Sequence, residues 1–525
     1  MPSPKPRRTA RCAPKACRVG VHRARRLNRA RAAALASLGA AVAVLAPSTV
    51  RAQATYASAP IGGRSALMGG TGIALGRDGA APFLDPATIA RVDDSGVAFS
   101  VNFYSFQTTH LTSFHQPLPV GTPGGQLSLP ATSLDSARAD ALPSTLCLFL
   151  DVGQPHEAAA SGHRKGRRKL AGCIVTPERA HTSVTAQGYA GDSLGMHATQ
   201  AVTIDESWNR VYVGPTYGVY LSDSLAVGAS VWGVGTIASS TWSIGTLVQD
   251  ASPGGHGFAS AYDTASSAYS ADVLASVGLL WHVSEHQLLG VSASTPSLHL
   301  FGHYQGTSDV TSVAQGGSSV LSTSDGNYEA PPPVRLGAGY GADMGRMHVE
   351  GDLSAYFPVA NLANAGVNTT ETRLAGGTTT SSSAGRSLFV TGQPAVDAAV
   401  GVEWFLSPGL SVLAGASTDF SALSPLAQSP AVGTLAESRM QRAAVSFGIG
   451  SYGDGSELLL GTQLAYGWGK SLAVDPYGAQ PQLALVEQRS FGAMLVIAGG
   501  VSLTAFKRTL QDLRTMVRLP APPKK

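Results

Sequence analysis

Two cysteines and three charged residues are the side chains of this sequence whose types and spacing could do chemistry. Cys147 and Cys173 could form a disulfide, which is the usual outcome for a cysteine pair in an oxidising compartment. Arg335, Glu350 and Asp352 could form ion pairs with one another in a shielded interior. No G-x-S-x-G, H-E-x-x-H or Walker A motif accompanies them, so we expect neither an enzyme nor a bound metal or cofactor.

The segments that carry these charges alternate between two kinds of side chain with a period of two. Between Met347 and Tyr356, one face consists of Met347, Val349, Gly351, Leu353 and Ala355. The other face consists of His348, Glu350, Asp352, Ser354 and Tyr356. A helix cannot give this pattern, because its period is about 3.6 residues. The second face of such segments is mostly small or polar and poor in Lys, which fits a strand between lipid and a polar lumen.

Fourteen strands of this kind are expected along the chain. They cover residues 95–108, 141–152, 168–178, 208–221, 222–240, 268–284, 285–298, 332–344, 345–357, 395–407, 408–420, 439–452, 454–469 and 488–504. The connections alternate between long segments rich in Ser, Thr, Gly and Pro and, with one exception, tight turns. Long outer loops and short periplasmic turns are typical of outer-membrane barrels. We therefore predict an all-β fold, an antiparallel transmembrane β-barrel of about fourteen strands with both termini in the periplasm.

Aromatic residues near the expected strand ends could form girdles at the two lipid–water interfaces. The candidates are Tyr104, Tyr212, Tyr217, Tyr220, Trp242, Trp281, Tyr340 and Trp404. The alternative explanation is the general preference of aromatic residues for strands.

Composition and the N-terminal segment both indicate export. Charged residues make up only 13% of the chain and glycine 61 of 525 residues, which disfavours soluble helical proteins and disordered chains. Residues 1–54 hold 12 of the 37 Lys and Arg residues and no Asp or Glu. An apolar run at 32–46 and the small-x-small site Ala52-Gln53-Ala54 complete a signal peptide. The rest of the chain is net acidic, so nucleic acid is not an expected partner, and residues 507–525 form a basic periplasmic tail.

Residues 55–94 do not alternate and are predicted to form an N-terminal hatch in the lumen of a barrel at residues 95–506. The segment is compact and rich in small residues, and it contains Gly69-Gly70, Asp78 and Asp85-Pro86-Ala87. The alternative is a disordered periplasmic leader. The apolar content of the segment favours the hatch.

These features resemble the FadL family of outer-membrane transporters for long-chain fatty acids and aromatic hydrocarbons. The hatch of that family carries a glycine-rich stretch, an acidic residue and an Asn-Pro-Ala turn. Gly69-Gly70, Asp78 and Asp85-Pro86-Ala87 correspond to these, and the resemblance continues at residues 331–340 and 401–408 and in the strand count. Two features depart from the family: Asp85 replaces its Asn, which alters or removes an amide contact, and the chain ends in a basic tail.

The resemblance implies a monomer in the outer membrane of a Gram-negative bacterium that passively takes up hydrophobic small molecules, with membrane lipid and the ligand as its partners. In the family, a ligand is caught in an outer groove, passes to a lumen pocket and leaves sideways through a kinked third strand. Two alternatives stay open. One is a structural or scaffolding barrel without transport, and the other is a lipid-modifying barrel enzyme.

Simple hairpin register gives an expectation for the cysteines. A turn centred on residue 160 places Cys147 directly opposite Cys173 on the second and third strands. Directly opposite residues of antiparallel strands lie about 4.5–5.5 Å apart at Cα, within disulfide distance. We therefore expect a bond that restrains the third strand.

The same reasoning gives an expectation for the charges. A turn centred directly after residue 343 places Arg335 opposite Asp352, with Glu350 as its diagonal neighbour. Opposite charges across a strand pair stabilise it by about 0.2–1 kcal/mol. We therefore expect an ion-pair cluster that points into the lumen.

Overall fold

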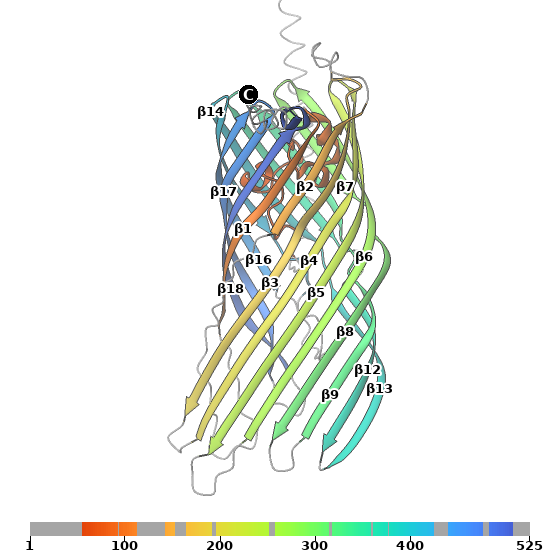
Figure 1. Ribbon diagram of the computed structural model, residues 1–525, viewed down its shortest axis with the longest axis vertical. Coiled ribbons are helices and arrows are strands. Elements are labelled where there is room, and N and C mark those ends of the chain that lie inside the picture. Colours follow the sequence, from red (N-terminus) through yellow and green to blue (C-terminus); the bar gives the residue numbers. More distant parts are fainter. Residues whose placement is uncertain are drawn as a thin grey trace, which may run out of the picture. The chain divides into compact units, whose positions relative to one another are not determined.

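The computed structural model shows one sheet of antiparallel strands that closes into a barrel around a short helical segment (Figure 1). The structure describes residues 55–507, except residue 93 and the segments 113–141, 153–163, 192–195, 251–257, 314–317, 359–360, 376, 425–438 and 476–481. The expected signal peptide and residues 508–525 of the expected tail lie outside the described residues. Within the described part of the chain, no helix is long and apolar enough to cross a membrane.

Strand segments follow one another around the barrel with antiparallel pairing throughout. They are β1 (Gly96–Thr112), β2 (Leu142–Asp151), β3 (Arg168–Gly191), β4 (Met196–Ser222), β5 (Leu225–Asp250), β6 (Phe258–Ser284), β7 (Gln287–Ser294), β8 (Leu298–Val313), β9 (Ser318–Glu329), β10 (Val334–Asp343), β11 (Met347–Phe357), β12 (Asn361–Ala375), β13 (Thr378–Thr391), β14 (Ala395–Ser407), β15 (Leu410–Asp419), β16 (Arg439–Gly453), β17 (Ser456–Asp475) and β18 (Gln482–Ser502). β1 pairs with β18 and thereby closes the ring.

Four barrel strands are each interrupted near their middle, so that two segments continue one strand: β7–β8, β9–β10, β11–β12 and β13–β14. Every interruption contains proline, namely Pro296, Pro331 to Pro333, Pro358 and Pro394. Proline lacks the N–H that a ladder needs, so it ends or breaks a strand. The eighteen segments therefore make fourteen barrel strands, which confirms the predicted fold class.

A band of exposed apolar side chains surrounds the barrel at the end with the tight turns. On β6, the outward aromatic residues Tyr269 and Trp281 mark the two edges of this band. At about 3.3 Å per residue and a tilt of about 45°, the twelve residue-to-residue steps from Tyr269 to Trp281 span about 28 Å, close to the lipid-facing height of about 25 Å. The barrel thus has the surface of a membrane-spanning one.

The aromatic girdle is predicted only in part. Tyr217, Trp281, Tyr340 and Trp404 are exposed, as a girdle requires. Tyr212, Tyr220 and Trp242 are instead buried and point into the lumen, so their assignment to the girdle is wrong. Tyr212 and Tyr220 lie an odd number of residues from the exposed Tyr217 on β4, and Trp242 lies an odd number from the exposed Ile237 on β5, which places all three on the inner face. The side chain of Tyr104 lies outside the described residues.

Most of the long connections predicted between strands are strand in the structure. The segments 179–207, 241–267, 299–331 and 358–394 are largely covered by extensions of β3 to β6, β8, β9, β12 and β13. These extensions run past Tyr269 on the side away from the tight turns (Figure 1). A sequence rich in Ser and Thr can form paired strands that are exposed to solvent. Thr favours the strand conformation, and both side chains are polar. Polar composition alone was therefore a poor sign of a loop.

The segment before β1 is a compact element inside the barrel, which we call the hatch (residues 55–92). It contains α2 (Arg64–Leu67), α3 (Ala81–Leu84) and the 3₁₀ helix η1 (Pro86–Arg91). α2 contacts β15 to β18, whereas η1 contacts β3 to β6 on another part of the wall. Such contacts with widely separated strands are possible only for a segment within the lumen (Figure 1).

Candidate ligand site in the barrel lumen

Carboxylates on the inner face of β11 hold the backbone of the hatch. Glu350 Oε1 accepts hydrogen bonds from the amides of Ala74 and Leu75, each at 2.7 Å. Asp352 Oδ2 accepts two more from Gly72 and Ile73, at 2.8 and 3.0 Å. Hydrogen bonds to a charged acceptor are about twice as strong as neutral ones, so these two side chains fix residues 72–75 against the wall.

Arg335 does not pair with Asp352, and the predicted register is wrong. β10 and β11 pair so that Arg335 opposes Tyr356 and Gly339 opposes Asp352. The tight turn is centred two residues later than expected, because Gly345 takes a left-handed φ of 79° there. Arg335 is nevertheless buried, and its Nη2 donates to two hatch carbonyls, including that of Leu84 at 2.7 Å.

Glu403 on β14 is a hatch contact that sequence reasoning missed. Its Oε2 lies 2.7 Å from Arg64 Nε and 3.3 Å from Arg77 Nη2, both in the hatch. Tyr452 and Ser411 donate hydrogen bonds to its other oxygen. Glu403 lies on the polar face of an alternating segment, which indicates an acid that faces the lumen. Its two hatch partners, however, lie more than 300 residues away in the sequence.

The glycine-rich stretch of the hatch packs directly against the backbone of β14 and β15. Gly69 and Gly70 have φ values of 74° and 89°, which disfavour other residues. A Cβ added to Gly69 would lie 2.6 Å from the amide nitrogen of Ala416 on β15. Asp78 holds two parts of the hatch together. Its carboxylate accepts hydrogen bonds from the backbone amide and the hydroxyl of Ser65, at 2.8 and 3.0 Å.

Asp85-Pro86-Ala87 forms the turn that begins η1. Asp85 Oδ1 accepts from the amide of Ala87 at 2.9 Å, which caps the helix. The turn presses on glycines of the wall, and a Cβ added to Gly278 would lie 1.7 Å from Asp85 Oδ1. Burial raises the pKa of Asp85 well above its ordinary value, which favours the neutral acid. A neutral Asp85 resembles the Asn of the family in shape and charge.

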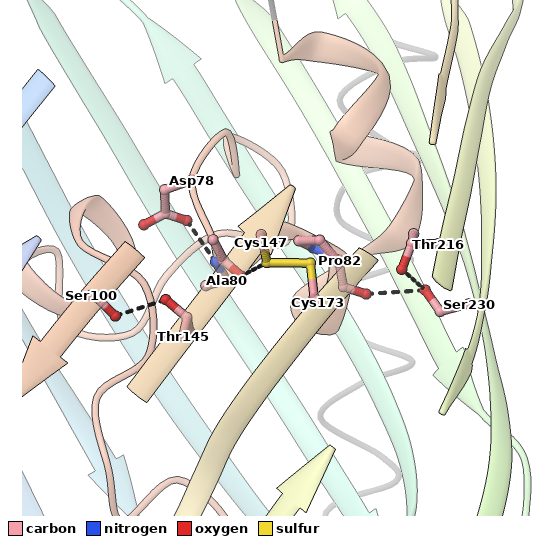
Figure 2. Close-up of a disulfide and its surroundings, with 10 residues drawn as sticks. Asp78, Ala80, Pro82, Ser100, Thr145, Cys147, Cys173, Thr216 and Ser230 are labelled. Carbon is pink, nitrogen blue, oxygen red and sulfur yellow. Dashed lines mark hydrogen bonds between the residues drawn. A yellow bond between two sulfur atoms is a disulfide. The ribbon is translucent and has the colours of Figure 1, made fainter. Parts of the chain in front are cut away.

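Cys147 and Cys173 are joined by a disulfide between β2 and β3, with Cα atoms 4.2 Å apart. The strand register places them directly opposite each other. Figure 2 shows the bond beside the hatch at Ala80 and Pro82, and Cys147 Sγ lies 3.2 Å from the carbonyl oxygen of Gly79. The bond therefore links two strands at a point where the hatch packs on them.

A small cavity lies between the hatch and the wall. Five aromatic side chains line it, two from the hatch and three from strands: Tyr56, Phe83, Tyr212, Trp232 and Tyr356. Its volume is about 30 Å³. Arg335 also lines the cavity, with its guanidinium carbon 4.7 Å from the centre of the Phe83 ring. The cavity combines aromatic walls with the guanidinium of Arg335 and the carboxylate of Glu178, whose Oε2 pairs with Arg210 Nη1 at 2.7 Å.

Beyond the lipid-facing band, the polarity of the wall reverses. On β5, Val231 and Ile237 face outward within the band, but Ser239 and Thr241 face outward beyond it. The buried inner face of the same stretch carries Trp242 and Ile244. Inward-facing aromatic and apolar residues recur on the neighbouring extensions, including Ile204, Tyr262, Tyr304 and Tyr328. Towards water the extensions carry mostly small or polar residues, with Leu247 and Leu321 as exposed exceptions, and towards the barrel axis they carry these aromatic and apolar residues together with Ser240, Ser308 and Thr369.

No group of three or more His, Cys, Asp or Glu residues that could hold a metal ion occurs among the described residues. No family model and no curated protein matches the sequence. A crystal structure of a Pseudomonas aeruginosa FadL homologue aligns with a TM-score of 0.55 at 13% identity, covering 86% of this chain and 100% of that one. The chain has the FadL fold.

Two further structures align at lower scores. The Pseudomonas putida toluene transporter TodX aligns with a TM-score of 0.47 at 12% identity, covering 86% of this chain and 100% of TodX. The Ralstonia pickettii toluene transporter TbuX aligns with a TM-score of 0.45 at 15% identity, covering 84% of this chain and 98% of TbuX. The assignment of the FadL fold rests on the first structure alone.

Proposed function

We propose that this chain is an outer-membrane channel for the passive uptake of small hydrophobic molecules. The observation that carries the proposal is the reversal of polarity beyond the lipid-facing band. Aromatic and apolar side chains on the inner face of a water-exposed wall offer an apolar ligand a surface on which it can leave water, and each Å² of apolar area removed from water stabilises by about 25 cal/mol.

The apolar lining continues from the outer wall to the cavity. Tyr304, Tyr328 and Val367 belong to a cluster on the extensions of β8, β9 and β12. Val390 packs both against this cluster and against a second one that contains Tyr56 and Tyr356. These two tyrosines also line the cavity. Apolar side chains therefore connect the outer wall with the residues that line the cavity.

The cavity must enlarge before it can accept a ligand. A cavity of about 30 Å³ has room for about two water molecules. Tyr56 and Phe83 belong to the hatch, whereas Tyr212, Trp232 and Tyr356 belong to the barrel. Movement of the hatch would withdraw the first two side chains and leave an aromatic site on the wall. The hatch is thus the element that admits or excludes the ligand.

Arg335 favours a ligand with an acidic end. In the closed state its Nη2 donates to the carbonyl oxygens of Phe83 and Leu84. When the hatch moves, this buried cation loses both acceptors and needs another, because an unpaired buried charge is costly. A carboxylate would satisfy it with two parallel hydrogen bonds. The geometry therefore favours fatty-acid-like ligands over neutral hydrocarbons.

Uptake into protein-containing liposomes tests this function, with oleate and toluene as the probes. Replacing Tyr304 and Tyr328 by Ser should slow the uptake of both probes, because it makes the inner wall polar. Tyr269→Ser is the matched control, since Tyr269 is an outward tyrosine of the same strand group. Equal uptake by all variants and by liposomes without protein would refute the channel and favour a scaffolding barrel.

The acidic-end preference has its own test. Arg335→Met keeps much of the side-chain length without the charge. We expect weaker uptake of oleate by about tenfold and little change for toluene, because a hydrogen bond to a charged group contributes about 1.5–3 kcal/mol. Equal losses for both probes would show that Arg335 acts only on the hatch.

A further inference from the structure

Three cations lie close together on the wall formed by β16, β17 and β18. Arg439 on β16 is directly opposite Lys470 on β17. Arg489 on β18 is opposite Trp468, two residues back along β17, so Arg489 is a diagonal neighbour of Lys470. Diagonal neighbours on a sheet are about 7–8 Å apart, within reach of long side chains. We call Arg439, Lys470 and Arg489 the basic cluster.

The basic cluster faces away from the lumen. Lys470 lies two residues from Trp468, and Arg489 lies two residues from Phe491. Trp468 and Phe491 are 40% and 44% exposed on the outside of the barrel. Residues two apart share a face of a strand, and directly opposite residues share a face of the sheet, so Arg439 faces outward together with Lys470.

The cluster lies at the outer edge of the lipid-facing band. Tyr466 and Trp468 stack on the outer face with ring centroids 5.9 Å apart, and Tyr466 is opposite Phe491. From these rings towards the tight turns, the outer face of β16 and β17 carries the exposed apolar residues Val445, Phe447, Ile449, Leu458 and Leu460. Aromatic rings of membrane proteins gather at the level of the lipid headgroups. The cations directly beyond the rings are therefore at the level of the outer headgroups.

Other strands carry uncharged residues at this level. The outward residues just beyond the band are Ser239 and Thr241 on β5, and Ser267 and Ala265 on β6. A general attraction between the barrel and an anionic membrane surface would need cations on these strands as well. The grouping on β16 to β18 points instead to a discrete anionic ligand.

The arrangement is unfavourable unless an anion neutralises it. Like charges directly opposite each other, such as Arg439 and Lys470, destabilise a strand pair. Glu487 is opposite Lys470 on the β18 side and offsets one of the three charges, so an excess of positive charge remains. Arg binds a phosphate through two parallel hydrogen bonds, and Lys binds it as a point charge. The chemistry of the cluster therefore fits phosphate groups.

We propose that the basic cluster and the apolar face next to it bind one molecule of lipid A, the multiply acylated sugar with two phosphates that occupies the outer leaflet of such membranes. The phosphates contact Arg439, Lys470 and Arg489. The sugars lie at the level of Tyr466 and Trp468, and the acyl chains cover the exposed apolar residues of β16 and β17. The site lies on the outside of the barrel and is independent of the proposed uptake through the lumen.

Lipid binding by the detergent-solubilised protein tests this site. The probe is hexa-acylated lipid A with both phosphates, and native mass spectrometry counts the bound lipid at increasing concentration. The test variant is Arg439→Gln/Lys470→Gln/Arg489→Gln, which removes three charges and keeps most of the side-chain length. The matched control is Arg164→Gln/Lys165→Gln/Arg168→Gln, which removes three exposed cations near the tight turns.

We expect the test variant to bind lipid A about a hundredfold more weakly, because each basic residue near an anionic lipid surface contributes about fivefold. The control should bind as the wild type does. Each single variant of the cluster should lose about fivefold, which keeps the test decisive if the triple variant fails to fold. Equal binding by the wild type and the cluster variants would overturn the site. An equal loss in the control would also overturn it, because net charge alone would then explain the effect. Equal competition by phosphatidylglycerol, which has one phosphate, would overturn it in favour of a non-specific anionic surface.

Discussion

Arg64 in the hatch and Glu403 on β14 form a buried ion pair, with Nε 2.7 Å from Oε2. The pair joins α2 of the hatch to the inner wall of the barrel. Arg77 shares the same carboxylate oxygen, so one acid holds two hatch cations. This places the ion-paired attachment of the hatch on β14, whereas Phe83 of the hatch packs on the side of β4 to β6.

Loss of the Glu403 charge should loosen the hatch. Removing one partner of a buried ion pair costs about 3–5 kcal/mol, because the other charge is left uncompensated. For Glu403→Gln we expect faster hydrogen exchange of hatch amides and greater leakage of small solutes, with the barrel still assembled. Glu329→Gln is the control, because Glu329 is exposed on the outer face. Unchanged exchange in the Glu403 variant would show that the backbone contacts alone hold the hatch.

Asp85→Asn should be tolerated and should remove a dependence on pH. The pKa of Asp85 is raised by burial, so the stability contributed by the neutral acid is complete below the ordinary pKa of Asp. It is lost as pH rises through the raised pKa, when the buried group ionises. Asn stays neutral, so the variant should keep the hatch protected from hydrogen exchange as pH rises through the raised pKa of Asp85, where the wild type loses protection. Parallel pH profiles for the two proteins would contradict this account.

A side chain at Gly415 should displace the hatch. A Cβ there would lie 2.2 Å from the backbone of Met68 and Gly69, closer than any van der Waals contact. We expect Gly415→Ala to cost about 1–3 kcal/mol of hatch docking, measured by limited proteolysis of the hatch. Gly351→Ala is the matched control, because the nearest atom to its added Cβ is 4.0 Å away. Equal proteolysis of both variants would show that the hatch accommodates the extra methyl group.

Removal of the disulfide should destabilise the barrel without affecting its assembly. The bond closes a loop with a sequence separation of 26 residues, and such bonds contribute about 2–4 kcal/mol. We expect Cys147→Ser/Cys173→Ser to lower the unfolding temperature in detergent, and reduction of the wild type to lower it equally. Alkylation of both thiols in the native protein without reductant would show that the bond does not form.

Local pattern was enough to find the strands but not every register. The opposition of Cys147 and Cys173 follows from hairpin symmetry and is found in the strand pairing. The same reasoning failed for Arg335, because one left-handed glycine, Gly345, moved the centre of the turn. A shift of one turn residue moves every cross-strand pair along the hairpin. The assumed turn centre was therefore right for the hairpin of β2 and β3 and wrong for that of β10 and β11.

The outer wall and the hatch contacts escaped prediction for different reasons. Beyond Ile237 the period of two continues, but the apolar residues change faces, and a period carries no information about which face is inside. The partners of Glu403 depend on how a distant segment enters the lumen. A buried acid on a strand facing a lumen signals that some donor is near, without saying which. Such contacts become visible only when the fold is known.

The closure of β1 on β18 has a consequence for biogenesis. The hatch precedes the first strand of the ring and touches strands on widely separated parts of it, from β3 to β18. A finished ring of continuous strands offers no wide gap through which a folded plug of this kind could later be threaded. The hatch must therefore already contact the growing sheet before β1 pairs with β18 and closes the ring. Variants that weaken its attachments would then be expected to trap barrels sealed around an empty lumen, with residues 55–92 left outside.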